Sequence, residues 1–212
     1  PTEEELERQR AESFDYSPRL SIVIPAYKTP ERYLREMLQS IEAQTYKNWE
    51  VCVADGSPRG ESSERLLRRF AERDQRFKYV ILGENKGIAG NTNAAMEMAT
   101  GDFIVLADHD DTLPPHALYE CVKAINSDPE YDVLYSDEDK LDMDGKALFD
   151  PHFKPDFNPD LLTSVNYICH LFVVNRELVE AVGGFRQEFD GAQDYDFIFR
   201  CTEAARKICH IP

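Results

Sequence analysis

Carboxylate residues follow an apolar run in the segment FIVLADHDD, which spans residues 103–111. Asp108 and Asp110 stand two residues apart directly after this run, and Asp111 comes next. Carboxylates at this spacing can hold one hard cation, Mg²⁺ or Mn²⁺, together with waters and the phosphates of a nucleotide. They can also cap the helix that follows, a role that suits Asp111 or Thr112. The spacing alone leaves both roles open.

Two further segments could contact a nucleotide. Asp55 ends the apolar segment 49–55 and precedes Gly56 and Ser57. It could form a plain turn, or present its carboxylate to a nucleobase or a ribose hydroxyl. The glycine-rich segment 83–93, GENKGIAGNTN, opens a predicted helix whose backbone N–H groups would favour phosphate. Because it has neither the Walker A nor the G-x-G-x-x-G pattern, it is a weak signal for a generic phosphate loop.

Asp194 begins a predicted amphipathic helix in the segment EFDGAQDYDFIFR, residues 188–200. The helix dipole favours an acidic residue at this position, so a capping role is one interpretation. The other interpretation is a general base that faces the ligand crevice.

Strands and helices alternate through the first half of the chain and place these carboxylates. The predicted strands lie at 20–25, 49–55, 77–82 and 102–108, and the predicted helices at 30–44, 61–74, 88–100 and 114–128. Four such rounds indicate parallel strands joined by right-handed crossovers and covered on both faces. In such sheets ligands bind at the carboxyl ends of the strands, so Asp55 and Asp108 should face one crevice.

The pattern changes after about residue 130. One strand is followed by a polar stretch rich in proline and aspartate, with a hairpin turn at 143–146, and another strand is predicted at 167–175. Two helices, within 176–185 and 192–206, precede a last strand that begins at Lys207. We expect a mixed second half that closes over the same crevice.

Composition excludes some classes of protein. Hydrophobic residues make up 42% of 212 residues, which allows a substantial core, and the net charge of −16 repels nucleic-acid backbones. The five cysteines lack zinc-type spacing and several lie in apolar runs, which favours a reducing compartment, here the cytoplasm. No stretch has the length and apolarity of a membrane span or a signal peptide. Because the sequence begins at Pro1 and stops abruptly at Pro212, we expect a piece of a longer protein.

The order of the motifs is more specific than any single motif. The succession LSIVIPAYK, VADGS, NKGIAGNTNAA, GDFIVLADHDDTLPPHAL, YSDEDK and GGFRQEFDGAQDYDFIFR resembles the family 2 glycosyltransferases. The segments HFKPDF, SVNYICH and GAQDYD, with YSDEDK, are similar to bacterial members that build O-antigen, rhamnan and other surface polysaccharides. The resemblance covers residues 19–212 and leaves 1–18 as a charged helix or linker.

The resemblance implies the α/β GT-A fold, with a Rossmann-like, mostly parallel central sheet and helices on both faces. Its nucleotide-binding half would span about 19–111, and a mixed acceptor-side and catalytic half about 112–212. The residues it assigns to the nucleotide are Pro25, Ala26 and Tyr27 in the nucleoside pocket, Asp55 at the base (usually uracil), and Asn85, Gly87 and Asn93 near ribose and diphosphate.

The resemblance also implies a metal site and a catalytic base. Asp108-His109-Asp110 matches the D-x-D motif, in which Asp110 would be the usual ligand of Mn²⁺ or Mg²⁺. Asp108 would touch the ribose or a metal-bound water. Asp194 matches the catalytic base, and the preceding Gln193 stands where a Glu is common, so it cannot serve as an alternative base.

One departure concerns the metal site. Many members complete it with a His beyond the last strand, which would lie after Pro212, and His210 is a poor substitute within a predicted strand. We therefore expect weak metal binding and low turnover from this chain. The segment 137–170, with Asp137, Glu138, Asp139 and His170, is expected near the acceptor or the donor sugar.

The implied activity is inverting transfer of a sugar from a UDP or dTDP donor to a hydroxyl of a glycan or lipid-linked glycan. Peripheral association with the inner face of the membrane, through parts outside this chain, is compatible with such an acceptor. One alternative is a catalytically inactive sugar-nucleotide binding module, which the joint presence of Asp55, Asp110 and Asp194 disfavours. The other is a nucleotidyltransferase, which the lack of a glycine-rich signature in PAYKTPERYL disfavours.

Overall fold

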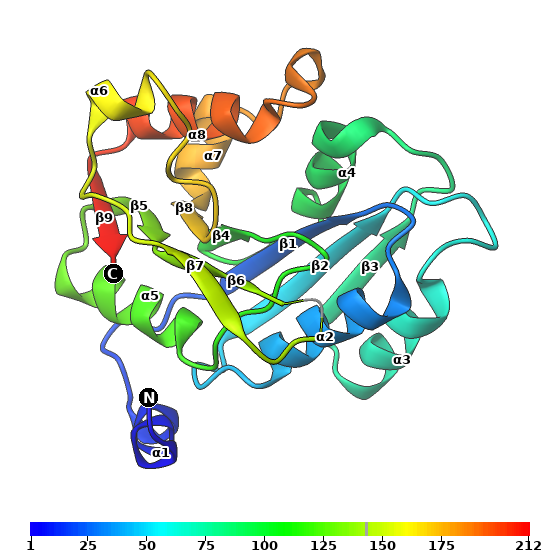
Figure 1. Ribbon diagram of the computed structural model, residues 1–212, viewed down its shortest axis with the longest axis horizontal. Coiled ribbons are helices and arrows are strands. Elements are labelled where there is room, and N and C mark those ends of the chain that lie inside the picture. Colours follow the sequence, from blue (N-terminus) through cyan, green and yellow to red (C-terminus); the bar gives the residue numbers. More distant parts are fainter. Residues whose placement is uncertain (143) are drawn as a thin grey trace.

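The computed structural model describes residues 1–142 and 144–212 and is built around one seven-stranded sheet (Figure 1). The strand order is β3-β2-β1-β4-β8-β5-β9, and β6 and β7 form a separate two-stranded hairpin. The strands are β1 Leu20–Ala26, β2 Trp49–Asp55, β3 Phe77–Ile81, β4 Phe103–Leu106, β5 Tyr131–Ser136, β6 Glu138–Leu141, β7 Leu148–His152, β8 Phe172–Asn175 and β9 Lys207–Ile211. The helices are α1 Glu3–Ala11, α2 Glu31–Glu42, α3 Glu64–Arg73, α4 Gly87–Met96, α5 Ala117–Ser127, α6 Pro159–Leu162, α7 Arg176–Val182 and α8 Gln193–Ala204, with one 3₁₀ turn at Gln187–Phe189. None of the helices in the described ranges is long and apolar enough to cross a bilayer.

The first half is the predicted parallel sheet. Strand β1 pairs in parallel with β2 and β4, and β2 pairs in parallel with β3. Every residue of β2, and all but one of β1, is buried, which explains why these strands are continuous apolar runs in the sequence. The connection after β1 leads to β2 on one side, and the connection after β3 crosses back to β4 on the other side of β1. At such a reversal of strand order, a crevice opens at the carboxyl ends of the strands.

Two hydrophobic cores cover the two faces of the sheet. Alternate residues of β1 divide between them, with Ile22 and Ile24 in one core and Val23 in the other. Helices α2, α3 and α5 pack on the first face, and α4, α7 and α8 on the second (Figure 1). The predicted α/β architecture with helices on both faces is therefore confirmed.

The second half mixes strand directions, as predicted. Strand β8 runs antiparallel to both β4 and β5, and β9 pairs in parallel with β5. The antiparallel β8 brings the segment that precedes it to the same edge of the sheet as the carboxyl end of β4. That placement brings the second half of the chain to the ligand edge.

Several predicted boundaries differ from the structure. The strand predicted at 167–175 begins only at Phe172, because Tyr167 and Ile168 are buried in the second core as a loop and Cys169 has a φ of +42°. An apolar run buried in a loop cannot be told from a strand by its pattern. The hairpin turn predicted at 143–146 joins β6 to β7, but Met143 lies outside the described residues. The charged N-terminal segment forms α1, which buries Leu6.

A buried carboxylate lies near the amino ends of the strands, opposite the carboxyl ends where the crevice opens. Glu50 of β2 is fully buried and accepts hydrogen bonds from the Thr100 backbone N–H at 2.6 Å and from the Ser21 hydroxyl at 2.7 Å. Arg19 and Lys78 form ion pairs with it at 2.9 and 2.7 Å. Burial alone would raise the pKa of Glu50, but these donors outweigh burial and lower it to about 2.

We expect Glu50→Ala to lower the free energy of unfolding by about 1–3 kcal/mol, because it leaves the Ser21 hydroxyl and the Thr100 N–H without their acceptor. The stabilisation from the Glu50 charge is fully present above the usual glutamate pKa of 4.5 and is lost as the pH falls toward about 2. Urea denaturation at pH 7, 5 and 3 should therefore show a smaller acid loss in Glu50→Gln than in wild type. The control is Glu64→Gln, whose carboxylate is exposed; equal acid losses in wild type and Glu50→Gln would contradict the assignment.

Candidate functional site

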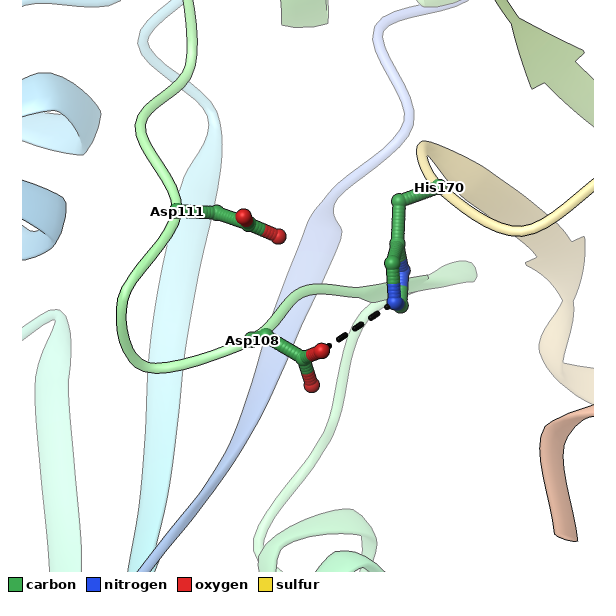
Figure 2. A group of neighbouring side chains, drawn as sticks. All are labelled: Asp108, Asp111 and His170. Carbon is green, nitrogen blue, oxygen red and sulfur yellow. Dashed lines mark ion pairs between the residues drawn. The ribbon is translucent and has the colours of Figure 1, made fainter. Parts of the chain in front are cut away.

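Three ligand-type side chains meet at the carboxyl edge of the sheet. Asp108 and Asp111 come from the loop after β4, and His170 comes from the loop before β8 (Figure 2). One ligand atom of each lies within 4.8 Å of the others, so the group has the composition and spacing to hold a metal ion. Figure 2 shows the imidazole of His170 directed at Asp108 from the opposite side of the crevice.

His170 and Asp108 of this group form an ion pair. Nε2 of His170 lies 3.3 Å from Oδ2 of Asp108. Burial alone would lower the pKa of His170, but Asp108, with smaller contributions from Asp111 and Asp194, outweighs burial and raises it to about 9. The same hydrogen bond with His170 lowers the pKa of Asp108. At neutral pH the pair is therefore an imidazolium and a carboxylate.

Asp194 shares a pocket with this pair. It is the second residue of α8, and the pocket is lined by Asp108, His170 and Asp194 together with Pro25 and Thr92. Burial raises the pKa of the Asp194 carboxyl, and the nearby charge of Asp108 adds to this effect, so that together they outweigh the charge of His170 and the hydrogen bond from Gln193, which lower it. A carboxylate with a raised pKa is a better proton acceptor than an exposed one.

Gln193 fixes the orientation of Asp194. Its Nε2 donates to Oδ2 of Asp194 at 2.9 Å, and its Oε1 accepts from the backbone N–H of Gly191 at 2.7 Å. An amide bridges the loop and the carboxylate in this way because it can donate and accept at once. This holding role is a physical reason for Gln193 at a position where the resemblance leads one to expect Glu.

The structure groups Asp111, rather than Asp110, with Asp108. The chain turns at 109–110, and the Asp111 N–H donates to the Asp108 carbonyl oxygen at 3.4 Å. A turn brings residues i and i+3 close together, whereas residues i and i+2 share a side only in an extended chain. Asp110 is exposed and lies outside the group of three, so its role as a metal ligand stays a prediction.

Asp55 is buried and its carboxylate is already engaged. One oxygen accepts from the Ser57 N–H at 2.8 Å and the other from the Ser63 N–H at 2.7 Å. Since Ser63 is the N-cap residue of α3, Asp55 fixes both the turn after β2 and the start of that helix. The turn interpretation is therefore observed, and the contact with a nucleobase stays a prediction.

The glycine-rich segment is also held by internal contacts. Oδ1 of Asn85 accepts from the N–H of Gly87 and from the side-chain amide of Asn91, both at 3.1 Å. Gly87 has a φ of +76°, a conformation that favours glycine. The N–H of Ala89 in the first turn of α4 donates to the carboxylate of Asp190 at 3.1 Å. The contacts of Asn85 and Gly87 with a nucleotide stay predictions.

The side chain of Asn93 is engaged in hydrogen bonds within the protein. Its side-chain amide donates to the Phe185 carbonyl and accepts from the Phe185 N–H, both at 2.8 Å. Those two bonds tie α4 to the segment before α8, and Asn93 lines a second pocket rather than the one around Asp108. Its contact with ribose or diphosphate stays a prediction.

The first-strand residues are divided between the core and the surface. Pro25 lines the pocket with Asp108, Ala26 is buried with its carbonyl bound by the Gly56 N–H at 2.9 Å, and Tyr27 is exposed. Pro25 and Ala26 end β1 and Tyr27 follows it, and the contact of these residues with a nucleoside stays a prediction.

The resemblance assigns His170 only to a segment, 137–170, that is expected near the donor sugar or the acceptor. Its pairing with Asp108 depends on the antiparallel β8, which no motif indicates. The sequence favours a capping role for Asp111, although the D-x-D-D run includes it. The turn at 109–110 is the feature that would have identified it.

Comparison with known proteins gives the same family as the motifs. The chain matches Glycosyl transferase family 2 over residues 21–183. It is 41% identical over 194 residues to the O-antigen biosynthesis protein RfbC of Myxococcus xanthus, a match that covers 92% of this chain and 15% of that protein. The chain spans less than a quarter of the length of the curated relatives that match it at 44% and 41% identity.

Two solved structures share the fold. Staphylococcus aureus TarS 1–349 in complex with UDP-GlcNAc superposes with a TM-score of 0.71 at 22% identity, over 91% of this chain and 56% of that chain. The mannosyltransferase PcManGT from Pyrobaculum calidifontis, in complex with GDP-Man and Mn²⁺, superposes with a TM-score of 0.67 at 24% identity, over 98% and 60%. The predicted fold is thereby confirmed.

The ion pair predicts a pH effect on stability in the presence of EDTA. Because the pKa of His170 is raised from 6.5 to about 9 on folding, its stabilisation is fully present below pH 6.5 and is lost as the pH rises through about 9. We expect wild type to lose about 3 kcal/mol between pH 6 and 10 from this source.

Urea denaturation of three variants checks this expectation. His170→Gln and Asp108→Asn should show a smaller loss over this pH range, since each removes one member of the pair. Asp110→Asn is the matched control and should behave as wild type, because Asp110 lies outside the group. A wild-type loss that is unchanged in His170→Gln would refute the pairing.

Proposed function

The chain belongs to glycosyl transferase family 2, and from this premise we propose that it is an inverting transferase. It moves a sugar from a UDP- or dTDP-linked donor to a hydroxyl of a glycan or lipid-linked glycan in bacterial surface polysaccharide synthesis. The observation that carries this proposal is the convergence of Asp108, His170 and Asp194 on one pocket at the carboxyl edge of the sheet.

The group of Asp108, Asp111 and His170 fits a divalent cation. Two carboxylates and one imidazole suit Mn²⁺, and their ligand atoms lie within 4.8 Å of one another. When bound, the cation would neutralise the charge that develops on the leaving diphosphate. His170 would have to release its proton to become a ligand. While protonated, it offsets part of the negative charge of the carboxylates and so favours the approach of an anionic donor.

His170 also offers a hydrogen-bond donor to a ligand. Its Nδ1 is buried and has no hydrogen-bond partner within residues 1–142 and 144–212. In an imidazolium both ring nitrogens are donors, and a buried donor without a partner is unfavourable. A phosphate oxygen of the donor would satisfy it, which supports a nucleoside diphosphate as the ligand.

Asp194 has the properties of the single base that inversion requires. It would take the proton from the acceptor hydroxyl as that oxygen attacks the anomeric carbon from the face opposite the leaving group. One displacement needs no covalent intermediate, so a second carboxylate in the role of nucleophile is not required. The raised pKa of Asp194 and the fixed orientation that Gln193 gives it support this role.

The similar proteins support the choice of donor and acceptor. TarS and PcManGT were solved with UDP-GlcNAc and with GDP-Man and Mn²⁺, and RfbC is named for O-antigen biosynthesis. We place the reaction in the cytoplasm, at the inner face of the bacterial membrane where a lipid-linked acceptor would be reached. All five cysteines are free, which fits a reducing compartment. The buried base favours an active enzyme over an inactive binding module.

We expect Asp194→Asn to retain UDP binding and to lower sugar transfer by about 10²–10⁴-fold, because a general base contributes a rate factor of this size. The measurement is release of nucleoside diphosphate from UDP-, dTDP- and GDP-sugars by the full-length protein with Mn²⁺. Asp160→Asn, another acidic residue in a first helical turn but exposed, is the matched control and should keep the wild-type rate. Equal turnover of Asp194→Asn and wild type would contradict the assignment of the base.

A further inference from the structure

A buried lysine contacts the loop that carries His170. Lys154 follows β7, and its side chain is fully shielded from solvent. Its ammonium group donates to the carbonyl oxygens of Ile168 at 2.6 Å and His170 at 2.5 Å, and lies 3.2 Å from Oε2 of Glu138. An ammonium group has three N–H donors, and these three acceptors use all of them.

Burial of this charge is unfavourable unless it is fully partnered. Burial lowers the pKa of Lys154, and the negative charge of Glu138 opposes that effect. Loss of one partner from a buried pair is strongly destabilising. Conformations in which an acceptor moves away from the Lys154 ammonium group are therefore unfavourable. Two of the three acceptors are backbone carbonyls on either side of Cys169, whose φ is +42°. The ammonium group therefore stabilises the turned backbone of 168–170.

The backbone of Lys154 is fixed from the central sheet. Its N–H donates to Oδ1 of Asp137 at 2.8 Å, and the same oxygen lies 2.8 Å from Nε2 of His210. The His210 ring stacks on Tyr135 of β5, with ring centroids 5.0 Å apart and an interplanar angle of 18°. These contacts connect the rigid strands β5 and β9 to the base of the lysine, and the lysine connects them to the loop.

The loop that the ammonium group holds is the one that presents the imidazole to Asp108. The carbonyl of His170 faces Lys154, and its imidazole lies 3.3 Å from Asp108 (Figure 2). We propose that Lys154 is a positioning residue of this site, which sets the backbone of 168–170 so that His170 meets Asp108. Its effect on sugar transfer rests on the proposed function, whereas its effect on the His170–Asp108 contact does not.

The contact itself can be tested by NMR of ¹⁵N-histidine-labelled protein without any ligand. The chain has five histidines, and the His170→Gln variant assigns the signal of His170. In wild type, Asp108→Asn should shift the His170 imidazole signals because it removes their charged partner. In the Lys154→Met background most of that response should disappear. The control is Lys140→Met, an exposed lysine of the same hairpin, which should leave the response intact.

A folded Lys154→Met protein in which His170 responds to Asp108→Asn as in wild type would overturn the proposal. If Lys154→Met does not fold, Lys154→Gln carries the same comparison, because it keeps an N–H donor without the charge. Failure of both variants to fold also overturns the proposal, since Lys154 would then support the whole fold rather than one loop. In Lys154→Arg, which retains the charge and N–H donors, Asp108→Asn should shift the His170 imidazole signals more than it does in Lys154→Met.

The consequence for transfer is tested by a double-mutant cycle in the full-length protein. Lys154→Met should lower kcat about tenfold or more, because small displacements of site residues have effects of this size. The double variant Lys154→Met/His170→Gln should have nearly the same kcat as His170→Gln alone, since the lysine acts through the histidine. Additive losses would assign Lys154 an independent role. Absence of transfer by wild type would reject the proposed function and leave the NMR comparison to decide the role of Lys154.

Discussion

The ion pair between His170 and Asp108 joins the two halves of the molecule at the ligand edge. Asp108 ends the parallel half, after β4, and His170 ends the loop that enters the antiparallel β8. The strands beneath them are largely apolar and buried on both faces, so an unpaired charged group is favourable only beyond their ends. This constraint places Asp108 and Asp111 beyond the end of β4, α8 adds Asp194 from the second half, and the imidazolium offsets the mutual repulsion of the three carboxylates.

A rigid frame surrounds this pair, and much of that frame is polar. Asp55, Asn85 and Asn93 direct their side chains to neighbouring backbone groups and so fix the loops after β2 and around α4. On the other side of the crevice, Lys154 fixes the loop that carries His170. The site therefore depends on two sets of internal hydrogen bonds, one in each half of the chain, which hold their shape before a ligand arrives.

The architecture was predictable from the sequence because its physical signals are local. Runs such as 20–25 and 49–55 have the apolar, β-branched character of buried parallel strands, and their order implies the crevice. The grouping at the site was only partly predictable. Asp111 lies with Asp108 because the chain turns at 109–110, and His170 reaches Asp108 because β8 is antiparallel. Both facts depend on backbone direction, which the residue types at those positions do not specify.

The most direct test of the central claim is calorimetric titration of UDP into the full-length protein, with Mn²⁺ and separately with EDTA. We expect UDP to bind with Mn²⁺, and we expect EDTA, Asp108→Asn and His170→Gln each to weaken that binding, because these residues form the group suited to a metal. UDP binding that is indifferent to EDTA and unchanged in both variants would contradict it.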